Sequence, residues 1–264
     1  MPSSILLADI VQYLDGYLRV REVPDEPVAL NGLQAENSSG RVSRIVAAVD
    51  ASLATILGTW GGATADEFRG STLLLVHHGL FWDGNLPLTG KRYRRVRALL
   101  DGDVALYSAH IPLDIHPEVG NNHVLARQLG LSSIEPFESY RGVPIGVQGR
   151  LGKAVPREAF QKQVETLLGA SSRLLAGGPE MSERIGIITG AAGGSIKTAR
   201  EAGLDTYLSG EGPHHSYFDA MELGVNVIYA GHYATETVGV KALAQHCTER
   251  FGIAWEFHAH PTGM

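Results

Sequence analysis

Short apolar runs alternate along this chain with segments of helical spacing. Between Ile5 and Leu18 apolar residues recur every three or four positions with polar residues between them, which predicts an amphipathic helix. Strands are then predicted at 44–49, 73–76, 104–108, 184–189, 205–209 and 225–229, and helices at 52–58, 91–100, 121–129, 157–168, 195–202, 214–223 and 235–250. This alternation indicates an α/β fold with mixed, largely parallel sheets.

Three segments fit this pattern less well. Residues 23–40 are rich in Pro, Asn and Gly and lack periodicity, so we expect a long ordered loop there. Residues 131–152 are irregular and are the expected junction between two halves. Residues 254–260 alternate enough to predict an edge strand.

The chain carries an internal duplication. Ala109-His-Ile-Pro-Leu-Asp114 and Gly231-His-Tyr-Ala-Thr-Glu236 each place an acid four residues after a His that follows a strand-like run. Upstream, 71–79 resembles 205–212, which aligns Glu211 with His78, and 44–50 resembles 184–190. We therefore expect two pseudo-symmetric α/β halves, residues 1–130 and 131–264.

Composition narrows the class of protein. A chain of 264 residues with 44% hydrophobic and 19% charged residues is typical of an ordinary globular protein. The formal net charge of −6 argues against nucleic acid as the main partner, because phosphate binding needs a basic face. A single cysteine excludes an intrachain disulfide, and no apolar run is long enough to cross a membrane. We expect a cytoplasmic protein with no membrane partner.

Histidines and acids follow the predicted strands of both halves. His77 and His78 end one strand, and Asp114, His232 and Glu236 follow two others. Side chains at the carboxyl ends of neighbouring strands converge on one crevice. The sequence therefore predicts a metal site between the halves, with zinc, iron, manganese or nickel favoured by mixed imidazole and carboxylate ligands.

Each of these residues also has a purely structural interpretation. Adjacent residues of a strand point to opposite faces, so an extended His77-His78 pair serves two neighbouring ions, or one ion if Gly79 turns the chain. Alternatively the pair is simply exposed at a strand end. Asp114 and Glu236 are also typical of acids that cap a helix or interact with its dipole. Their equivalent positions in the duplication favour a shared site.

Other candidate residues are weaker. His110 is predicted to be a catalytic proton carrier or a group that supports a metal ligand without binding the ion. Glu211, His214 and His215 are expected at the rim of the site or on an exposed helix, and His258 and His260 on the surface. The basic run 91–97 is expected to be a solvated helix face that pairs with acids such as Asp101, and binding of a phosphate is the alternative.

Several sequence blocks resemble the NIF-three-like family, a dinuclear-metal, hexamer-forming group widely labelled GTP cyclohydrolase I type 2 homologues. They span nearly the whole chain, and the last is highly specific. The blocks are Asn31-Gly-Leu-Gln34, Val76-His-His-Gly-Leu-Phe-Trp82, Ala109-His-Ile-Pro-Leu-Asp114 with Gly120-Asn121, Gly210-Glu211, and Ala230-Gly-His-Tyr-Ala-Thr-Glu236. The tail His258-Ala-His260-Pro departs from the family pattern.

The resemblance implies two divalent ions per chain. It assigns His78, Asp114 and Glu236 to one ion and His77, His232 and Glu236 to the other, with Glu236 bridging. It also implies a toroidal homohexamer whose metal sites face an internal cavity. The leading hypothesis is then a metal-dependent hydrolase of a small nucleotide-like or phosphorylated substrate. The alternative is a metal-binding, metal-delivery or scaffold protein without catalytic activity.

Overall fold

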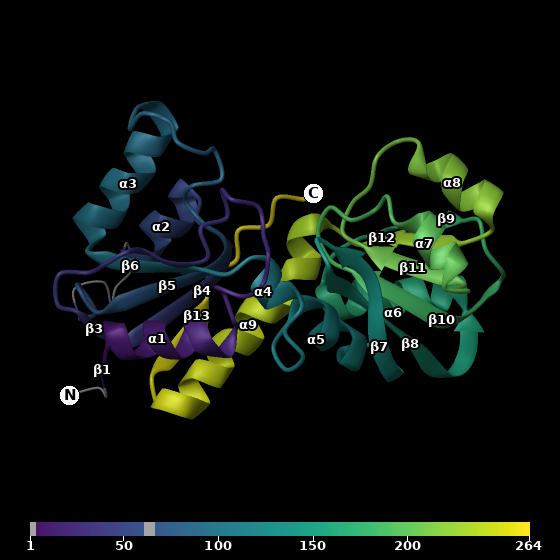
Figure 1. Cartoon of the computed structure of the whole chain (residues 1–264), viewed down its shortest axis with the longest axis horizontal. Coiled ribbons are helices and arrows are strands. Elements are labelled where there is room, and N and C mark those ends of the chain that lie inside the picture. Colours follow the sequence, from purple (N-terminus) through teal and green to yellow (C-terminus); the bar gives the residue numbers. More distant parts are fainter. Residues whose placement is uncertain (1–3, 61–66) are drawn as a thin grey trace. The chain divides into compact units, whose positions relative to one another are not determined.

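The computed structural model describes residues 4–60 and 67–264 (Figure 1). Contacts divide the chain into two compact units. Unit 1 comprises Met1–Leu113 and Val240–His260, and unit 2 comprises Asp114–Gly239 and Pro261–Met264. The sequence duplication suggested a division at residue 130, whereas contacts divide the chain inside α4 (Ile111–Asp114) and again inside α9 (His232–Phe251).

Unit 1 contains a five-stranded sheet in the order β13-β4-β5-β6-β2. The first four strands are parallel, and β2 runs antiparallel to β6. The strands are β2 (Gly32–Ala35), β4 (Arg44–Asp50), β5 (Thr72–His78), β6 (Val104–Ser108) and β13 (Ala254–Phe257), and β1 (Ile5–Leu6) pairs separately with β3 (Arg41–Val42). The edge strand predicted in the C-terminal tail is confirmed as β13.

Helices cover both faces of this sheet (Figure 1). On one face α2 (Leu53–Trp60) and α3 (Gly90–Gly102) pack over alternate residues of β4 and β5, among them Val46 and Leu74. On the other face lies α1 (Leu7–Tyr17), whose buried Leu7, Ile10 and Leu14 recur at helical spacing. Successive side chains of each strand point to opposite faces of the sheet, so one central sheet has an apolar layer on each face.

Unit 2 contains a six-stranded sheet in the order β7-β8-β10-β11-β12-β9. Only β10, β11 and β12 are parallel to one another, and their neighbours are antiparallel. The strands are β7 (Ser132–Tyr140), β8 (Val143–Pro156), β9 (Arg173–Ala176), β10 (Met181–Ile188), β11 (Thr206–Ser209) and β12 (Asn226–Tyr229).

The helices of unit 2 pack against this sheet. A core cluster joins α7 (Ile196–Glu201) and α8 (Ser216–Leu223) to the strands through residues such as Tyr207 and Val227. Beside β8 and β10 lies α6 (Arg157–Leu168), which buries Phe160 and Val164, and α5 (Asn121–Gln128) lies beside β7, β8 and β10. Among the described residues, no helix is both long and apolar enough to cross a membrane.

Four strands of each sheet share a topology, which confirms the internal duplication. In unit 1 the parallel strands β4, β5 and β6 are adjacent in that order, and antiparallel β2 follows β6. In unit 2 the parallel strands β10, β11 and β12 are adjacent in that order, and antiparallel β9 follows β12. The matched sequence segments therefore occupy equivalent strands of two similar sheets.

Two expectations about irregular segments were wrong. The expected loop 23–40 contains β2, a short edge strand whose register shifts between Leu33 and Ala35, which hides any alternation. The expected junction 131–152 forms most of the β7–β8 ribbon. Most of β7 is exposed, so it lacks the apolar alternation of a half-buried strand.

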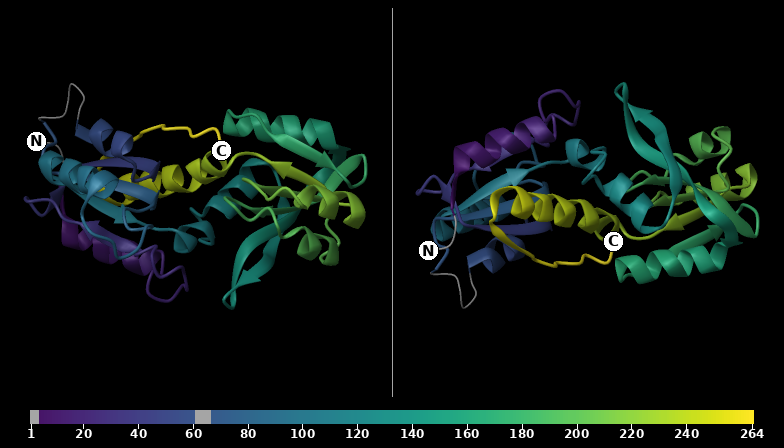
Figure 2. Two further views of the ribbon diagram at one scale, coloured as in Figure 1. Left: turned by 90° about the horizontal axis from the view of Figure 1, so that it is seen from above. Right: turned by 90° about the horizontal axis from the view of Figure 1, so that it is seen from below.

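The turn of this ribbon has a specific backbone conformation. Arg141 and Gly142 both have positive φ, 49° and 85°, and they connect Tyr140 directly to its cross-strand partner Val143. Such a two-residue turn matches the natural twist of a hairpin. Figure 2 shows the tip of the ribbon extending beyond the rest of its own sheet.

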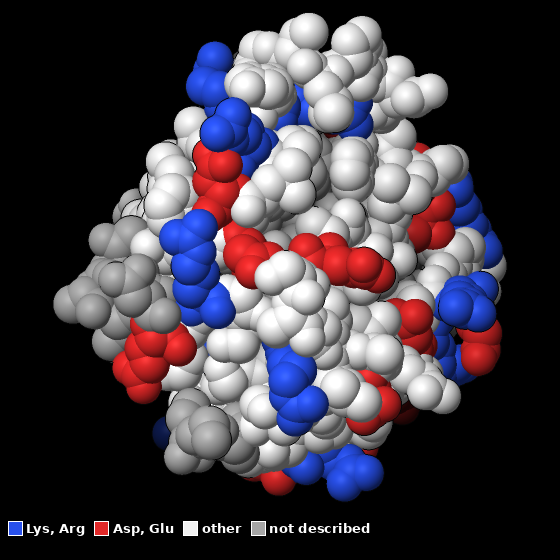
Figure 3. All heavy atoms as spheres, turned by 90° about the vertical axis from the view of Figure 1, so that its left-hand side faces the viewer, with Lys and Arg blue, Asp and Glu red and all other residues white. Residues whose placement is uncertain are grey.

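The basic run 91–97 lies on α3 and has mixed roles. Arg97 forms an ion pair with Asp101 at 2.7 Å, as expected for a solvated helix face. Arg92 is buried and donates hydrogen bonds to the carbonyls of Gly84 and Leu86, so it holds the preceding loop. Figure 3 shows basic and acidic side chains interspersed on this side of the molecule.

The core of unit 1 yields a stability prediction. Leu74→Ala should lower the free energy of unfolding by about 2–5 kcal/mol, because Leu74 is fully buried and its removal leaves a cavity. The matched control is Leu100→Ala on α3, where the side chain is 66% exposed and the expected change is below about 0.5 kcal/mol. Urea unfolding of both variants measures the difference, and equal effects would contradict the assigned core.

Candidate metal centre

Three histidines gather where the parallel strands of unit 1 end. His77 and His78 are the last residues of β5, and His110 follows the end of β6. One ring nitrogen from each lies within 4.8 Å of the others, a spacing that suits ligands of a metal ion. We call these three residues the histidine cluster. His77 is fully buried, and the other two are partly buried.

A fixed acceptor holds the Nδ1 atom of His77 and of His78. For His77 the partner is the carbonyl oxygen of Ala109, at 2.9 Å. For His78 it is the carboxylate of Asp50, also at 2.9 Å. Asp50 is the last residue of β4 and lies beside His78 in the register of the two strands, so the sheet itself sets this contact.

His110 is held by residues that precede the sheet. Its Nδ1 lies 2.8 Å from Asp25 Oδ1, and its backbone N–H donates to Asn31 Oδ1 at 2.8 Å. Asn31 in turn donates to Asp25 Oδ2, which also accepts from the backbone of Ile111. This network explains the role of the Asn31 block. Asp25 was missed because it lies in the segment expected to be a loop.

These contacts select one form of each ring. A carbonyl or an ionised carboxylate can only accept, so Nδ1 carries the proton and Nε2 of the neutral ring carries the lone pair. This is the arrangement in which an outer acceptor orients a metal-binding histidine and raises its basicity. The donor set of the histidine cluster therefore fits a metal ion.

Burial and neighbouring groups shift the pKa of Asp25 in opposite directions. Burial alone would raise the pKa of Asp25, but hydrogen bonding to His110, attraction to that ring when it is protonated, and hydrogen bonding to Asn31 outweigh this effect. The net result is a pKa below the usual value. Asp25 is therefore ionised at neutral pH and accepts a hydrogen bond from Nδ1–H of His110.

Close packing leaves room only for glycine beside the cluster. A Cβ atom on Gly79 would lie 2.3 Å from Nε2 of Gln34. Gln34 accepts a hydrogen bond from the backbone of Leu80, so it cannot move away without losing that bond. Trp82 contacts His110 edge-on, with ring centroids 4.7 Å apart. Gln34 and Trp82 thus hold the turn that follows the two histidines.

Unit 2 places an imidazole and two carboxylates at its own strand ends. His232 and Glu236 lie in the first turns of α9, after β12, and Glu211 follows β11. His232 Nε2 lies 3.1 Å from Glu236 Oε1, and its Nδ1 lies 2.6 Å from Glu211 Oε1. Glu211, expected only at the rim, therefore orients His232 as Asp50 orients His78.

Glu236 is buried, and its carboxylate lies against a glycine. It is 3% exposed, and a Cβ atom on Gly190 would lie 2.4 Å from its Oε1. Gly190 has a positive φ of 69° and donates its N–H to the hydroxyl of Thr235. The glycine-rich loop after β10 therefore approaches Glu236 closely.

Asp114 is held in the same unit. Its Oδ1 accepts from Asn121 Nδ2 at 2.8 Å and from the hydroxyl of Thr189 at 3.3 Å. Asn121 is fully buried, and its own Oδ1 accepts from the backbone of Gly239 in α9. These bonds fix the orientation of a carboxylate that would otherwise rotate.

His232 has a strongly perturbed pKa. Burial lowers it, but hydrogen bonding and the charge of Glu236, followed by those of Glu211, raise it to about 9. A metal ion that binds at Nε2 therefore has to displace a proton from His232.

The sequence-predicted residues thus fall into two groups. In unit 1, His77 and His78 lie together with His110, which was expected to be catalytic rather than a ligand. In unit 2, His232 contacts Glu236, and Thr189 and Asn121 hold Asp114. The structure thus contains histidine and glutamate groups that can hold a metal ion.

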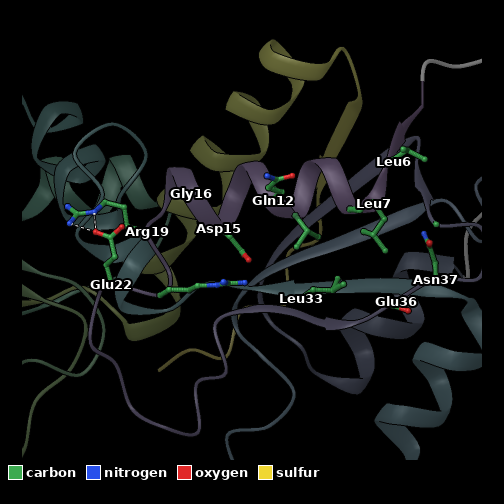
Figure 4. Close-up of a pocket in the computed structure, with 14 residues that line it drawn as sticks. Leu6, Leu7, Gln12, Asp15, Gly16, Arg19, Glu22, Leu33, Glu36 and Asn37 are labelled. Atoms are coloured by element: carbon green, nitrogen blue, oxygen red, sulfur yellow. Dashed lines mark hydrogen bonds and ion pairs between the residues drawn. The ribbon is translucent and has the colours of Figure 1, made fainter.

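Unit 1 also has a groove of about 830 Å³, and none of the candidate metal ligands lines it. It lies along α1, and Figure 4 shows Leu7 and Leu33 in its lining, with the ion pair of Arg19 and Glu22 toward one end. None of the described residues that line it is a histidine.

The C-terminal histidines were expected on the surface, and they are only partly exposed. His258 and His260 are partly buried, with ring centroids 6.2 Å apart. A Cβ atom on Gly58 would lie 2.7 Å from His258 Nδ1, so the tail packs against α2.

Comparison with known proteins identifies the family. The family model described as Duf34/NIF3 (NGG1p interacting factor 3) matches residues 5–262. The chain belongs to this NIF3 family. A relative from Deinococcus radiodurans, named GTP cyclohydrolase 1 type 2 homolog, is 45% identical over 257 residues, covering 97% of this chain and 94% of the relative. A relative of the same name from Pyrococcus abyssi is 42% identical, covering 97% of this chain and 98% of the relative.

Solved structures agree with this membership. Protein TTHA1606 from Thermus thermophilus matches with a TM-score of 0.86 and 38% identity, covering 98% of this chain and all of that one. Protein ybgI, described as of unknown function, matches with a TM-score of 0.88 and 31% identity over the same shares of the two chains. The NIF3 fold therefore extends over nearly the whole chain.

The outer contact of His78 yields a prediction. Asp50→Ala should weaken Zn²⁺ binding about 10- to 100-fold, because Nδ1 of His78 loses the carboxylate that orients it. The control is Asp101→Ala, which removes only an exposed ion pair on α3. Competition with a chelating dye measures both affinities. Equal affinities in the two variants would show that Asp50 does not support a metal ligand.

Proposed function

We propose that this chain is a dinuclear-metal hydrolase of a small nucleotide-like or phosphorylated substrate. The observation that carries the proposal is the set of oriented histidines. His77, His78 and His232 each have Nδ1 held by a carbonyl or a carboxylate, which leaves Nε2 as the ligand atom. His110 has Nδ1 held by Asp25, which leaves its Nε2 to accept a proton.

The proposed ligands are His77, His78, Asp114, His232 and Glu236. Imidazole and carboxylate donors suit zinc, iron, manganese or nickel better than calcium or magnesium. Five protein ligands for two ions leave coordination positions for water and substrate, which is a property of catalytic rather than structural sites. In this proposal Glu236 would be a ligand of both ions.

The residues around the histidine cluster have distinct roles in hydrolysis. When bound, a pair of divalent ions supplies Lewis acidity and lowers the pKa of water. His110 Nε2 accepts the proton of the attacking water, and Asp25 stabilises the resulting imidazolium through Nδ1. Asp25 also keeps the His110 ring in one orientation throughout the reaction.

The name shared by the relatives bears on the substrate. Several are called GTP cyclohydrolase 1 type 2 homolog, so GTP belongs in the set of substrates to be tested. A family name is an analogy and leaves the reaction to be argued from the site. We further propose that the chain acts in the cytoplasm as a toroidal homohexamer, as the family resemblance implies.

Metal content tests the bridging ligand. Glu236→Ala should remove both ions, because each ion would lose the carboxylate that they share. Glu201→Ala, an exposed glutamate of unit 2, is the control and should keep the parental content. Elemental analysis of purified protein measures ions per chain. Full content in Glu236→Ala would exclude a bridging role.

Activity tests His110 separately from metal binding. His110→Ala should reduce hydrolysis of bis(p-nitrophenyl) phosphate or GTP about 10²- to 10⁴-fold, the usual contribution of a general base, with metal content unchanged. His215→Ala removes an exposed histidine and serves as the control. Loss of metal in His110→Ala would make His110 a ligand. Metal binding without hydrolysis in the parent would favour a metal-delivery or scaffold role.

A further inference from the structure

A pocket of about 390 Å³ lies in unit 2, beside the carboxyl end of β12. Its walls come from the loop after β11, the first turn of α8 and the start of β9. This volume lies within the range of small-molecule sites. Neither the proposed ligands nor the proposed general base line this pocket.

Aromatic rings form one wall. Tyr217 and Phe218 are 45% and 52% exposed, which is unusual for rings of this size. Their centroids are 5.6 Å apart in an edge-to-face arrangement, and His214 contacts Phe218 in the same manner at 6.0 Å. The wall therefore offers ring faces and edges to a planar ligand.

The floor of the pocket is rigid. The hydroxyl of Tyr229 donates to Gly193 O at 2.8 Å and lies 2.7 Å from Ser216 Oγ. A Cβ atom on Gly212 would lie 2.3 Å from the same hydroxyl, so only glycine fits there. The shape of the pocket thus exists before any ligand arrives.

Arg173 gives the pocket its charge. It is exposed and lies directly opposite Tyr229 in the register of β9 and β12, so both side chains are on one face of the sheet. None of the described residues that line the pocket is acidic. A guanidinium beside aromatic rings suits a ligand that combines a planar ring with an anionic group.

The pocket is connected to Glu211, the residue that orients His232. Gly212 follows Glu211 directly, and Gly193, which accepts from Tyr229, donates its backbone N–H to the carbonyl of Glu211 at 2.9 Å. A ligand in the pocket therefore lies one short chain of hydrogen bonds from a proposed metal ligand.

We propose that this pocket binds the base of a nucleotide substrate, with the ring against Tyr217 and Phe218 and an anionic group of the same molecule on Arg173. The inference rests on the proposed hydrolase function, because it assigns part of the substrate of that site. It adds the substrate class, a nucleotide rather than a simple phosphoester.

Calorimetric titration of the full chain with GMP and AMP tests the site. Phe218→Ala and Tyr217→Ala should each weaken nucleotide binding roughly 5- to 150-fold, the range of base stacking on an aromatic side chain. Both rings are half exposed, so the variants should keep the parental melting temperature. The control is Tyr93→Ala on α3, which removes a ring that is 51% exposed in unit 1.

Variants of Arg173 test the anionic group of the ligand separately from its planar ring. Arg173→Ala should weaken binding of GMP but leave binding of guanosine unchanged, and Arg173→Lys should restore part of the loss. Ribose 5-phosphate, which lacks the ring, should bind poorly to every variant. Absence of nucleotide binding in the parent, or parental affinity in Phe218→Ala and Tyr217→Ala, would overturn the inference.

Nucleotide titrations of the protein with a chelator present, compared with hydrolysis assays with metal added, distinguish this inference from the hydrolase proposal. Nucleotide binding that depends on Phe218, in a protein that hydrolyses nothing with metal added, supports the pocket and contradicts the hydrolase. Hydrolysis of bis(p-nitrophenyl) phosphate by a parent that binds no nucleotide supports the hydrolase and contradicts the pocket.

Discussion

The chemistry of this chain depends on one recurring interaction, a hydrogen bond from Nδ1 of a histidine to an acceptor that the fold holds in place. The acceptor of His77 is a backbone carbonyl at the end of β6, and that of His78 is the last residue of the adjacent strand. Because each acceptor is tied to the sheet, the rings are oriented before any ion binds. Preorganisation of this kind would lower the entropic cost of binding a metal ion, because the candidate ligands are already ordered.

The parallel strands explain why such contacts recur. In each unit adjacent parallel strands end at one edge of the sheet, four in unit 1 and three in unit 2, and polar side chains lie at or just after these ends. The same edge carries His78, the last residue of β5, in unit 1 and Glu211, which follows β11, in unit 2. A duplicated topology therefore supplies two sets of candidate ligands, each with its supporting acceptors. The glycines beside them, Gly79 and Gly190, follow from the close approach of backbone to these side chains.

Much of the fold was predictable from the sequence, because its central strands are continuous apolar runs and its helices have clear periodicity. The strand at 104–108 and the helix at 157–168 have the predicted bounds. Short or exposed strands were missed, since β2, β7 and β9 gain their order from neighbours rather than from their own pattern. The candidate ligands were recognisable by residue type and position, whereas Asp25 and Asp50 were not. Their role arises from contacts with His110 and His78 across 85 and 28 residues of sequence, respectively, which no local pattern reveals.

Divergence between the two halves has a chemical consequence. Neutral imidazoles supply no negative charge to a metal ion. In unit 1 the carboxylates of Asp25 and Asp50 contact the Nδ1 atoms of His110 and His78 and are therefore engaged as acceptors. Unit 2 contributes Asp114 and Glu236, and Glu236 is almost fully buried. A buried carboxylate is costly unless a cation or a network of donors compensates for it. In the absence of an ion, the proton on His232 compensates for this charge, as its raised pKa indicates. A divalent ion would take over that role, so the carboxylate half of the duplication is the part that binding of a cation would most stabilise.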